Sequence, residues 1–290
     1  MTIGTNNNER YNFLGQGDRK FNVCSDVDEV VVNTAPKLCR LILEELNLVN
    51  WYGTVITEQD VLDRDQFELN SWIPKFLKVK VPHMFDEDVL SYGMFEDIAL
   101  KMYKKHEMDF YDDLELSNFG KYLQRTSFKI NHLLFVTHQG NNDTNADSKI
   151  RFLERNFGDV ENTGELRVYP IPMDKKKSDT LNKVATELGW DIYIDDRCSI
   201  IKDVLTNCVT TGKTIMLTKW DYSGNELESM NDRLDGSTKN VPILANIRII
   251  TNMLPITFTE FNVTELTSTQ QRIKLNNEKL QSEIDEENKP

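Results

Sequence analysis

The chain has 290 residues, of which 39% are apolar and 28% are charged, and its formal net charge is −13 at pH 7. This length and composition suffice for one large or two ordinary domains with a buried core, and they exclude a chain dominated by disorder. The acidic balance argues against a protein that grips long nucleic acid through its phosphates, because such proteins usually present a basic surface.

No apolar run is long enough to cross a membrane, and the first ten residues lack the apolar stretch of a signal peptide. We therefore expect a cytoplasmic protein. The four cysteines show no CxxC spacing, which favours reduced thiols over disulfides or zinc ligands: Cys24, Cys39, Cys198 and Cys208.

After a polar extension over residues 1–20, the segment 21–31 places Asp26 and Asp28 two residues apart at the end of a predicted strand. Alternating strand side chains would put both carboxylates on one face. Carboxylates that close repel each other unless a hard cation or a shared proton relieves them. A solvated turn after a strand would give the same residues, so the later segments have to decide.

The spacing of apolar residues over 36–46, with Pro36 at its start, predicts a helix directly after this strand. Helical patterns continue over 50–130 with few strand patterns, so we expect 36–130 to be an all-helical insert. From 131 to 260, strands alternate with helices, which predicts a parallel sheet. Its expected strands include 133–138, which has Thr137 at its carboxyl end, and 167–171, 192–194 and 214–218.

Two further segments carry charge at element ends. Lys175, Lys176 and Lys177 precede a predicted helix capped by Ser178 or Asp179. Cations usually lie at the other end of a helix, so a lysine there indicates either a local anion or a solvated basic turn. The run 190–194 then ends in the paired carboxylates Asp195 and Asp196.

In this order, Asp-x-Asp, Thr, Lys and Asp-Asp resemble the four motifs of the haloacid dehalogenase-like (HAD) phosphohydrolases. The resemblance covers residues 21–35 and 131–220 and is greatest to the 5′(3′)-deoxyribonucleotidase branch and its phage relatives; a viral chain would lie in the host cytoplasm. Glu29 departs from the pattern, since many members have glycine there. The implied fold is α/β: a Rossmann-like parallel sheet (21–35 and 131–260) with an inserted helical cap (36–130) and a polar tail (261–290).

The resemblance implies a Mg²⁺-dependent phosphomonoester hydrolase that acts through an aspartyl-phosphate on nucleoside monophosphates. Asp26 would be the nucleophile and Asp28 the general acid and base, while Thr137 and Lys177 would bind the phosphoryl group. Lys175, Lys176 and Lys183 are alternatives to Lys177. Mg²⁺ would be held by Asp26, the carbonyl of Asp28, Asp195 and Asp196.

His138 and Arg197 adjoin the motifs as candidate substrate contacts, and a structural hydrogen bond is an equal alternative for His138. One or two cap aromatics are candidates for stacking on a base, although most are expected to be cap core: Trp51, Tyr52, Phe67, Trp72 and Phe76.

Other functions remain open. One is a polynucleotide 3′-phosphatase or another small-molecule HAD phosphatase, and another is a catalytically silent interaction protein of the same fold. Residues 210–214 are similar to the end of a phosphate-binding loop, but Asn207 stands where its first glycine is required, which favours a plain loop. The tail predicts either a frayed helix or a contact in a homo-oligomer. The expected partner is a small phosphorylated substrate, not a membrane.

Overall fold

The computed structural model describes residues 19–82, 92–106, 108–126, 129–139, 144–158, 165–210, 212–219, 246–251 and 258–261. The predicted tail beyond 261 and the first eighteen residues lie outside this range. The strands are β1 (Phe21–Ser25), β2 (Ile130–His138), β3 (Leu166–Ile171), β4 (Ile192–Asp195), β5 (Thr214–Lys219), β6 (Asn246–Thr251) and β7 (Phe258–Phe261).

The helices fall into two groups along the chain. Between β1 and β2 lie α1 (Ala35–Glu45), the 3-10 helix η2 (Val49–Trp51), α2 (Glu58–Leu62), α3 (Leu69–Lys80), α4 (Tyr92–Lys105) and α5 (Asn118–Arg125). Between later strands lie α6 (Thr144–Phe157), α7 (Lys177–Glu187) and α8 (Cys198–Asn207). In the described residues, no helix is both long and apolar enough to cross a membrane.

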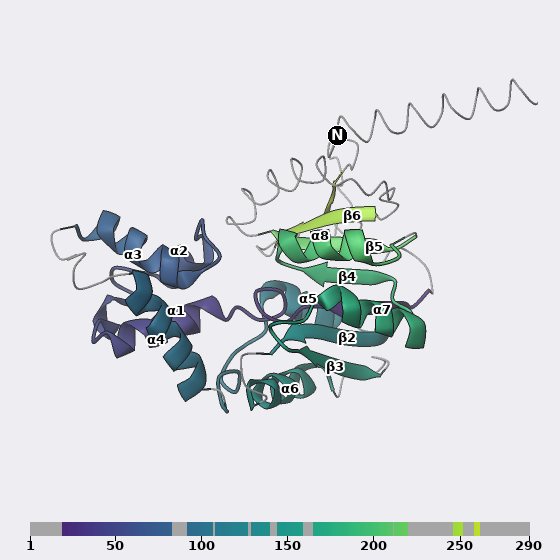
Figure 1. Ribbon diagram of the computed structural model, residues 1–290, viewed down its shortest axis with the longest axis horizontal. Coiled ribbons are helices and arrows are strands. Elements are labelled where there is room, and N and C mark those ends of the chain that lie inside the picture. The colour runs from purple at the N-terminus through teal and green to yellow at the C-terminus, as the bar shows by residue number, and fades with distance from the viewer. Residues whose placement is uncertain are drawn as a thin grey trace, which may run out of the picture.

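The strands form one sheet in the order β3-β2-β1-β4-β5-β6-β7 (Figure 1). Neighbouring strands from β3 to β6 pair in parallel, and β7 alone pairs antiparallel within the described sheet. The predicted α/β fold with a Rossmann-like parallel sheet is thereby confirmed. The chain moves outward from β1 through β2 to β3, and then returns to β4 on the other side of β1. Ligands of such sheets bind where the strand order reverses, at the carboxyl ends of the strands.

Successive side chains of the central strands enter two different cores, as strand geometry requires. Val23 of β1 belongs to the core that also contains Phe119 of α5 and Phe152 of α6. Cys24 belongs to the opposite core, with Leu181 of α7 and Ile201 of α8. Both faces of the sheet are therefore covered by helices, and only the strand ends remain for a polar site.

The first four α-helices contact one another and lie to one side of the sheet (Figure 1). Helix α1 begins with Pro36 in its first turn, as its sequence predicts. It ends before Asn47, whose φ of 58° is the left-handed conformation that terminates many helices. Helix α5 lies closer to the sheet. Its Gly120 packs so tightly that a Cβ would stand 2.3 Å from the carbonyl oxygen of Val31.

The turn that follows β1 differs from the predicted geometry. The strand ends at Ser25, and the backbone N–H of Asp26 donates to Ile194 of β4. The chain then curls back, because the carbonyl of Val27 accepts hydrogen bonds from the N–H groups of the three valines at 30–32. The expectation that strand alternation puts Asp26 and Asp28 on one face is therefore wrong, since both residues lie beyond the strand.

Candidate active site

Three of the predicted residues lie where parallel strands end. Asp26 follows β1, Thr137 is near the end of β2, and Asp195 is the last residue of β4. Strand β1 pairs with both β2 and β4, so these side chains meet at the point where the strand order reverses. All three are buried, with 7%, 1% and 0% of their surfaces exposed, respectively.

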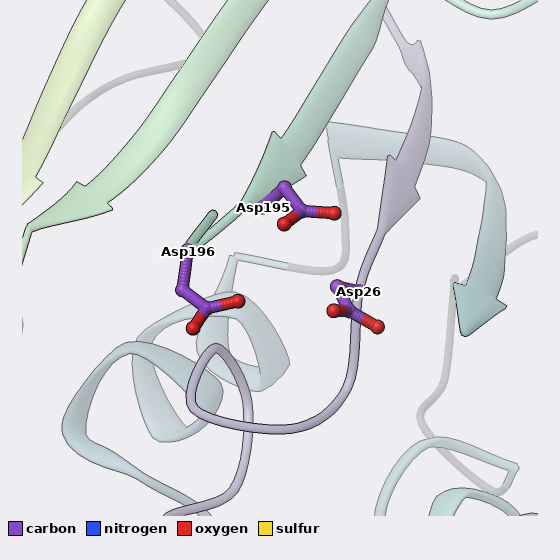
Figure 2. Close-up of side chains that lie close together, drawn as sticks. All are labelled: Asp26, Asp195 and Asp196. Carbon is purple, nitrogen blue, oxygen red and sulfur yellow. The ribbon is translucent and has the colours of Figure 1, made fainter. Parts of the chain in front are cut away.

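Asp26, Asp195 and Asp196 form a compact carboxylate cluster (Figure 2). One oxygen atom from each side chain lies within 4.8 Å of the others, and all three residues are buried. Asp28 is not a member: its side chain, 35% exposed, turns to other partners. Of the four aspartates predicted to hold a metal, three therefore direct their side chains to a common point. The fourth, Asp28, could bind an ion there only through its backbone carbonyl.

Lys177 supplies the positive charge of this cluster. Its Nζ lies 2.6 Å from Asp26 Oδ2 and 2.8 Å from Asp195 Oδ2, and only 1% of its side chain is exposed. The three alternative lysines have mostly exposed side chains and pair with carboxylates outside the cluster: Lys175 with Asp174, Lys176 with Asp203, and Lys183 with Glu187.

Helix α7 positions this lysine by beginning at Lys177 itself. The predicted cap at Ser178 or Asp179 is wrong: Lys176 is the N-cap, it makes no side-chain capping bond, and the Ser178 hydroxyl is buried without a hydrogen-bond partner in the described structure. A lysine in the first helical turn is disfavoured by the helix dipole. The two carboxylates that Lys177 contacts compensate for that placement.

The charges in the cluster shift one another. Burial alone would raise the pKa of Asp26, but the ammonium of Lys177 outweighs burial and holds the pKa below its ordinary value. Burial, reinforced by the charge of Asp26, raises the pKa of Asp195 despite its contact with Lys177. Burial would lower the pKa of Lys177, but the two aspartates raise it, so the lysine stays protonated. Of these two carboxylates, Asp26 is consequently the better suited to act while ionised.

Asp195 is also fixed in place by hydrogen bonds. Tyr193, two residues earlier on β4, donates its hydroxyl to Asp195 Oδ2 at 2.5 Å. The backbone N–H of Arg197 donates to Asp195 Oδ1 at 3.0 Å. Each oxygen of the Asp195 carboxyl group therefore accepts a hydrogen bond, and these two bonds fix the orientation of the group relative to Asp26.

The cluster fits a hard divalent cation. It contains three carboxylates and one ammonium, so it carries excess negative charge in a buried place, where unpaired charge is costly. In the described structure Asp26 Oδ1 is buried and lacks a hydrogen-bond partner, although buried polar atoms normally have one. Carboxylate oxygens are the ligands that Mg²⁺ prefers. The donor set thus suits Mg²⁺.

Asp28 contacts two residues that the sequence did not indicate. Tyr111, from the segment between α4 and α5, donates its hydroxyl to Asp28 Oδ1 at 2.6 Å. Lys149 of α6 lies 2.7 Å from Asp28 Oδ2 and 3.1 Å from the hydroxyl of Thr137. Lys149 therefore joins two of the predicted catalytic residues.

A sequence signal for Lys149 did exist. In α6 the buried apolar residues Ala146, Leu153 and Phe157 have helical spacing, and Lys149 lies on that same stripe, three residues after Ala146 and four before Leu153. A lysine on the apolar face of an amphipathic helix is unusual, because buried lysines need a partner. Tyr111 offers no such signal, since it lies in an irregular segment without periodicity.

The two residues predicted as additional substrate contacts, His138 and Arg197, have different partners. The ring of His138 makes a 3.0 Å hydrogen bond through Nε2 with the backbone carbonyl of Lys175, the structural alternative. The guanidinium of Arg197 stacks 4.6 Å from the ring centre of Phe67, which lies between α2 and α3. The Nε of Arg197 is buried without a hydrogen-bond partner in the described structure. Phe67, in the chain between β1 and β2, therefore contacts a residue beside the carboxylate cluster.

The other predicted aromatics pack within the insert. Trp72 is a core residue and packs against Phe76 in a tilted arrangement, with ring centres 4.7 Å apart. Trp51 and Tyr52 are partly buried against the same core. Their placement follows the expectation that most aromatics of the insert serve packing.

No protein-family model matches the chain, and a comparison with curated proteins found no match. Among solved structures, it is similar to a hydrolase from Streptococcus pneumoniae TIGR4, with 13% identity, a TM-score of 0.37, and coverage of 65% of this chain and 88% of that one. A haloacid dehalogenase-like family hydrolase from Streptococcus pneumoniae gives 13% identity and a TM-score of 0.38 over 69% and 85% of the two chains. The HAD-hydrolase YfnB of Bacillus subtilis, bound to magnesium, gives 14% identity and a TM-score of 0.30 over 69% and 81%. Likeness at these identities and TM-scores does not by itself assign a function.

Proposed function

We propose that the protein is a Mg²⁺-dependent phosphomonoester hydrolase that acts through an aspartyl-phosphate on Asp26. The observation that carries this proposal is the position of Lys177, which contacts both Asp26 and Asp195 in a buried cluster of three carboxylates. A phosphoryl group arriving at such a cluster needs cations on several sides, because its charge is spread over its oxygens. One fixed lysine and a divalent ion would supply them.

The reaction divides one displacement into two. In the first, a carboxylate oxygen of Asp26 forms a bond to phosphorus while the bond between phosphorus and the ester oxygen breaks. Asp28 gives a proton to the departing oxygen. In the second, Asp28 takes a proton from water, which attacks phosphorus and releases inorganic phosphate from Asp26. The lowered pKa of Asp26 supports its role as an ionised nucleophile.

Two further residues would stabilise the charge that develops during transfer. Lys177 would offset the negative charge on Asp26 and on the phosphoryl oxygens without transferring a proton. Thr137 would donate its hydroxyl to a phosphoryl oxygen from the end of β2.

Mg²⁺ would be held by Asp26, the carbonyl of Asp28, Asp195 and Asp196. When bound, it would neutralise negative charge shared between the cluster and the phosphate. The residues of this chain would meanwhile orient the phosphate and move the proton through Asp28.

For the substrate we propose a nucleoside monophosphate, with the chain acting as a 5′(3′)-deoxyribonucleotidase and residues 36–130 as its cap. Support comes from the contact between Phe67 of the insert and Arg197 beside the cluster, which brings an aromatic face near the site. Aromatic faces stack on bases with little dependence on sequence. The net charge of −13 fits a small substrate better than a polynucleotide.

Phosphate release from a panel of esters tests this function. The panel contains deoxyribonucleoside 5′- and 3′-monophosphates, sugar phosphates and a 3′-phosphorylated oligonucleotide, each with Mg²⁺ and with EDTA. We expect Mg²⁺-dependent release that is fastest from the nucleotides. Release from another ester alone would keep the mechanism and change the substrate, whereas release from none would overturn the proposal.

A further inference from the structure

The carboxyl group of Asp28 is held at both of its oxygens. The hydroxyl of Tyr111 contacts Oδ1 at 2.6 Å, and the ammonium of Lys149 contacts Oδ2 at 2.7 Å. A carboxylate offers about four lone-pair sites, so each oxygen keeps one site for a proton or a substrate atom. Two such contacts prevent rotation of the carboxyl group while leaving it accessible, in accordance with its 35% exposure.

Lys149 is buried and held by hydrogen bonds, unlike a surface lysine. Its side chain is 4% exposed, and its Nζ has three acceptors: Asp28 Oδ2, the hydroxyl of Thr137 at 3.1 Å and the carbonyl of His138 at 2.9 Å. An ammonium has three N–H donors, so these contacts account for all of them. The acceptors come from the turn after β1 and from the end of β2, and Lys149 ties these two segments together.

Tyr111 is anchored to the same helix. Its backbone N–H donates to the hydroxyl of Ser148 at 2.9 Å, and Ser148 precedes Lys149 in α6. Its ring stands 5.2 Å from the Lys149 ammonium and is buried in the core that contains Phe152. Helix α6 thus fixes both groups that contact the Asp28 carboxyl group.

We propose that Lys149 and Tyr111 are positioning residues that hold the Asp28 carboxyl group at the ester oxygen of the substrate. This inference rests on the proposed function, because it names the residues that hold Asp28, the general acid of the proposed reaction. Neither residue needs to touch the substrate. Proton transfer requires a heavy-atom separation of about 3 Å, so a carboxyl group free to rotate would spend much of its time out of reach.

The dependence of rate on the leaving group distinguishes this role from simple stabilisation of the fold. From a deoxyribonucleoside 5′-monophosphate, the nucleoside leaves as an alkoxide that needs the proton from Asp28. From p-nitrophenyl phosphate, p-nitrophenolate leaves as a stable anion and hardly needs it. Misplacing Asp28 should therefore lower kcat/KM, which reports formation of the aspartyl-phosphate, far more for the nucleotide than for p-nitrophenyl phosphate.

The experiment measures kcat and KM of the full-length Lys149→Met and Tyr111→Phe proteins with both esters, in Mg²⁺. For Lys149→Met we expect kcat/KM on the nucleotide to fall about 10²-fold, the loss typical of a misplaced catalytic group. The loss of kcat/KM on p-nitrophenyl phosphate should be much smaller, although kcat can fall on both esters, because hydrolysis of the shared aspartyl-phosphate uses Asp28 as base. Tyr111→Phe keeps the ring and should show the same pattern more weakly, which preserves the test if Lys149→Met does not fold.

Two controls sharpen the result. Arg151→Met removes an exposed ion pair between the same helix and Asp112, and should leave both kcat values near wild type. Combining Lys149→Met with Asp28→Asn should be no worse than Asp28→Asn alone, because both changes remove one function.

If the wild type is active, equal losses of kcat/KM on the two esters, or additive losses in the double variant, would overturn the role of Lys149 and Tyr111 and leave the proposed function standing. A wild type that releases phosphate from neither ester would overturn the proposed function and this inference with it.

Discussion

Lys177 is the residue on which the charge balance of the site depends most. It stands between Asp26 and Asp195, and its side chain is almost fully buried. Its removal would leave adjacent carboxylates without their counter-charge, which is costly in a buried place. The same lysine gives Asp26 its lowered pKa.

Replacing Lys177 by Met should therefore lower kcat by about 10²–10³-fold, in the range of a lost transition-state donor. It should also lower the melting temperature, because the carboxylates then repel each other. The matched control is Lys183→Met in the same helix, where an exposed pair with Glu187 is lost. Phosphate release and thermal unfolding measure both effects, and equal activity of the two variants would refute the role of Lys177.

Phe67 is the residue that tests the nucleotide substrate. Replacing it by Ala removes the ring that stacks on Arg197, and should raise KM for a deoxyribonucleoside monophosphate while changing KM for a sugar phosphate little. The loss of one base-stacking contact should weaken the binding free energy of the nucleotide by about 1–3 kcal/mol. Steady-state kinetics on both substrates provides the measurement. A parallel rise in both KM values would argue against base recognition by Phe67.

Single residues also show what the sequence could predict. Asp26, Thr137 and Asp195 follow apolar runs, so their meeting at strand ends follows from the parallel sheet. Lys149 and Tyr111 were missed because their partners lie far away in the chain, and local patterns do not specify such pairs. The lysine on the apolar stripe of α6 was a usable signal.

At the scale of elements, the turn after β1 is tied to the insert through a buried ion pair. Glu29 Oε1 accepts hydrogen bonds from the N–H groups of Thr34 and Ala35 at the start of α1. Its Oε2 lies 3.6 Å from the guanidinium of Arg64, which follows α2, and both side chains are buried. Glu29 has a φ of 57°, a conformation that favours glycine, so its carboxylate has to offset backbone strain.

This pair predicts a large loss of stability on replacing Arg64 by Met. Leaving one buried charge unpaired costs about 3–5 kcal/mol in the free energy of unfolding. Urea denaturation measures it, with Arg40→Met in α1 as the control for an exposed pair. The added change Glu29→Gln should recover part of the loss. A loss below about 1 kcal/mol, as for exposed pairs, would contradict the assignment.

The sequence predicted the type of most described elements, but not the turn after β1. Apolar runs define β1 and β4, and helical spacing defines α1 and α7. The expectation that Asp26 and Asp28 share a strand face failed because β1 ends at Ser25 and the chain curls around the carbonyl of Val27. These hydrogen bonds join residues three to five apart, and an alternation of period two does not reveal such a turn.

At the scale of the whole molecule, the sheet brings distant segments to one charged site. Asp26, Lys177 and Asp195 come from three parts of the chain. Together with Asp196 they place three carboxylates against one ammonium, and this excess negative charge disfavours folding unless a further cation joins them. The proposed Mg²⁺ site therefore couples binding to global stability.

Adding Mg²⁺ should raise the melting temperature, since an ion that binds only the folded state stabilises it by about 2.7 kcal/mol at a concentration of 100 Kd. EDTA should reverse the rise. Asp196→Asn should reduce it, while Asp174→Asn, at an exposed pair with Lys175, should not. A rise of the same size in Asp196→Asn would place the ion elsewhere.

The most direct test of the account is the rate of Mg²⁺-dependent phosphate release by the folded Asp26→Asn protein, compared with wild type on a deoxyribonucleoside monophosphate. Asparagine keeps the shape of the side chain and removes the nucleophilic carboxylate. We expect phosphate release to fall to the background rate, with the circular dichroism spectrum unchanged. Release near the wild-type rate would show that Asp26 is not the nucleophile.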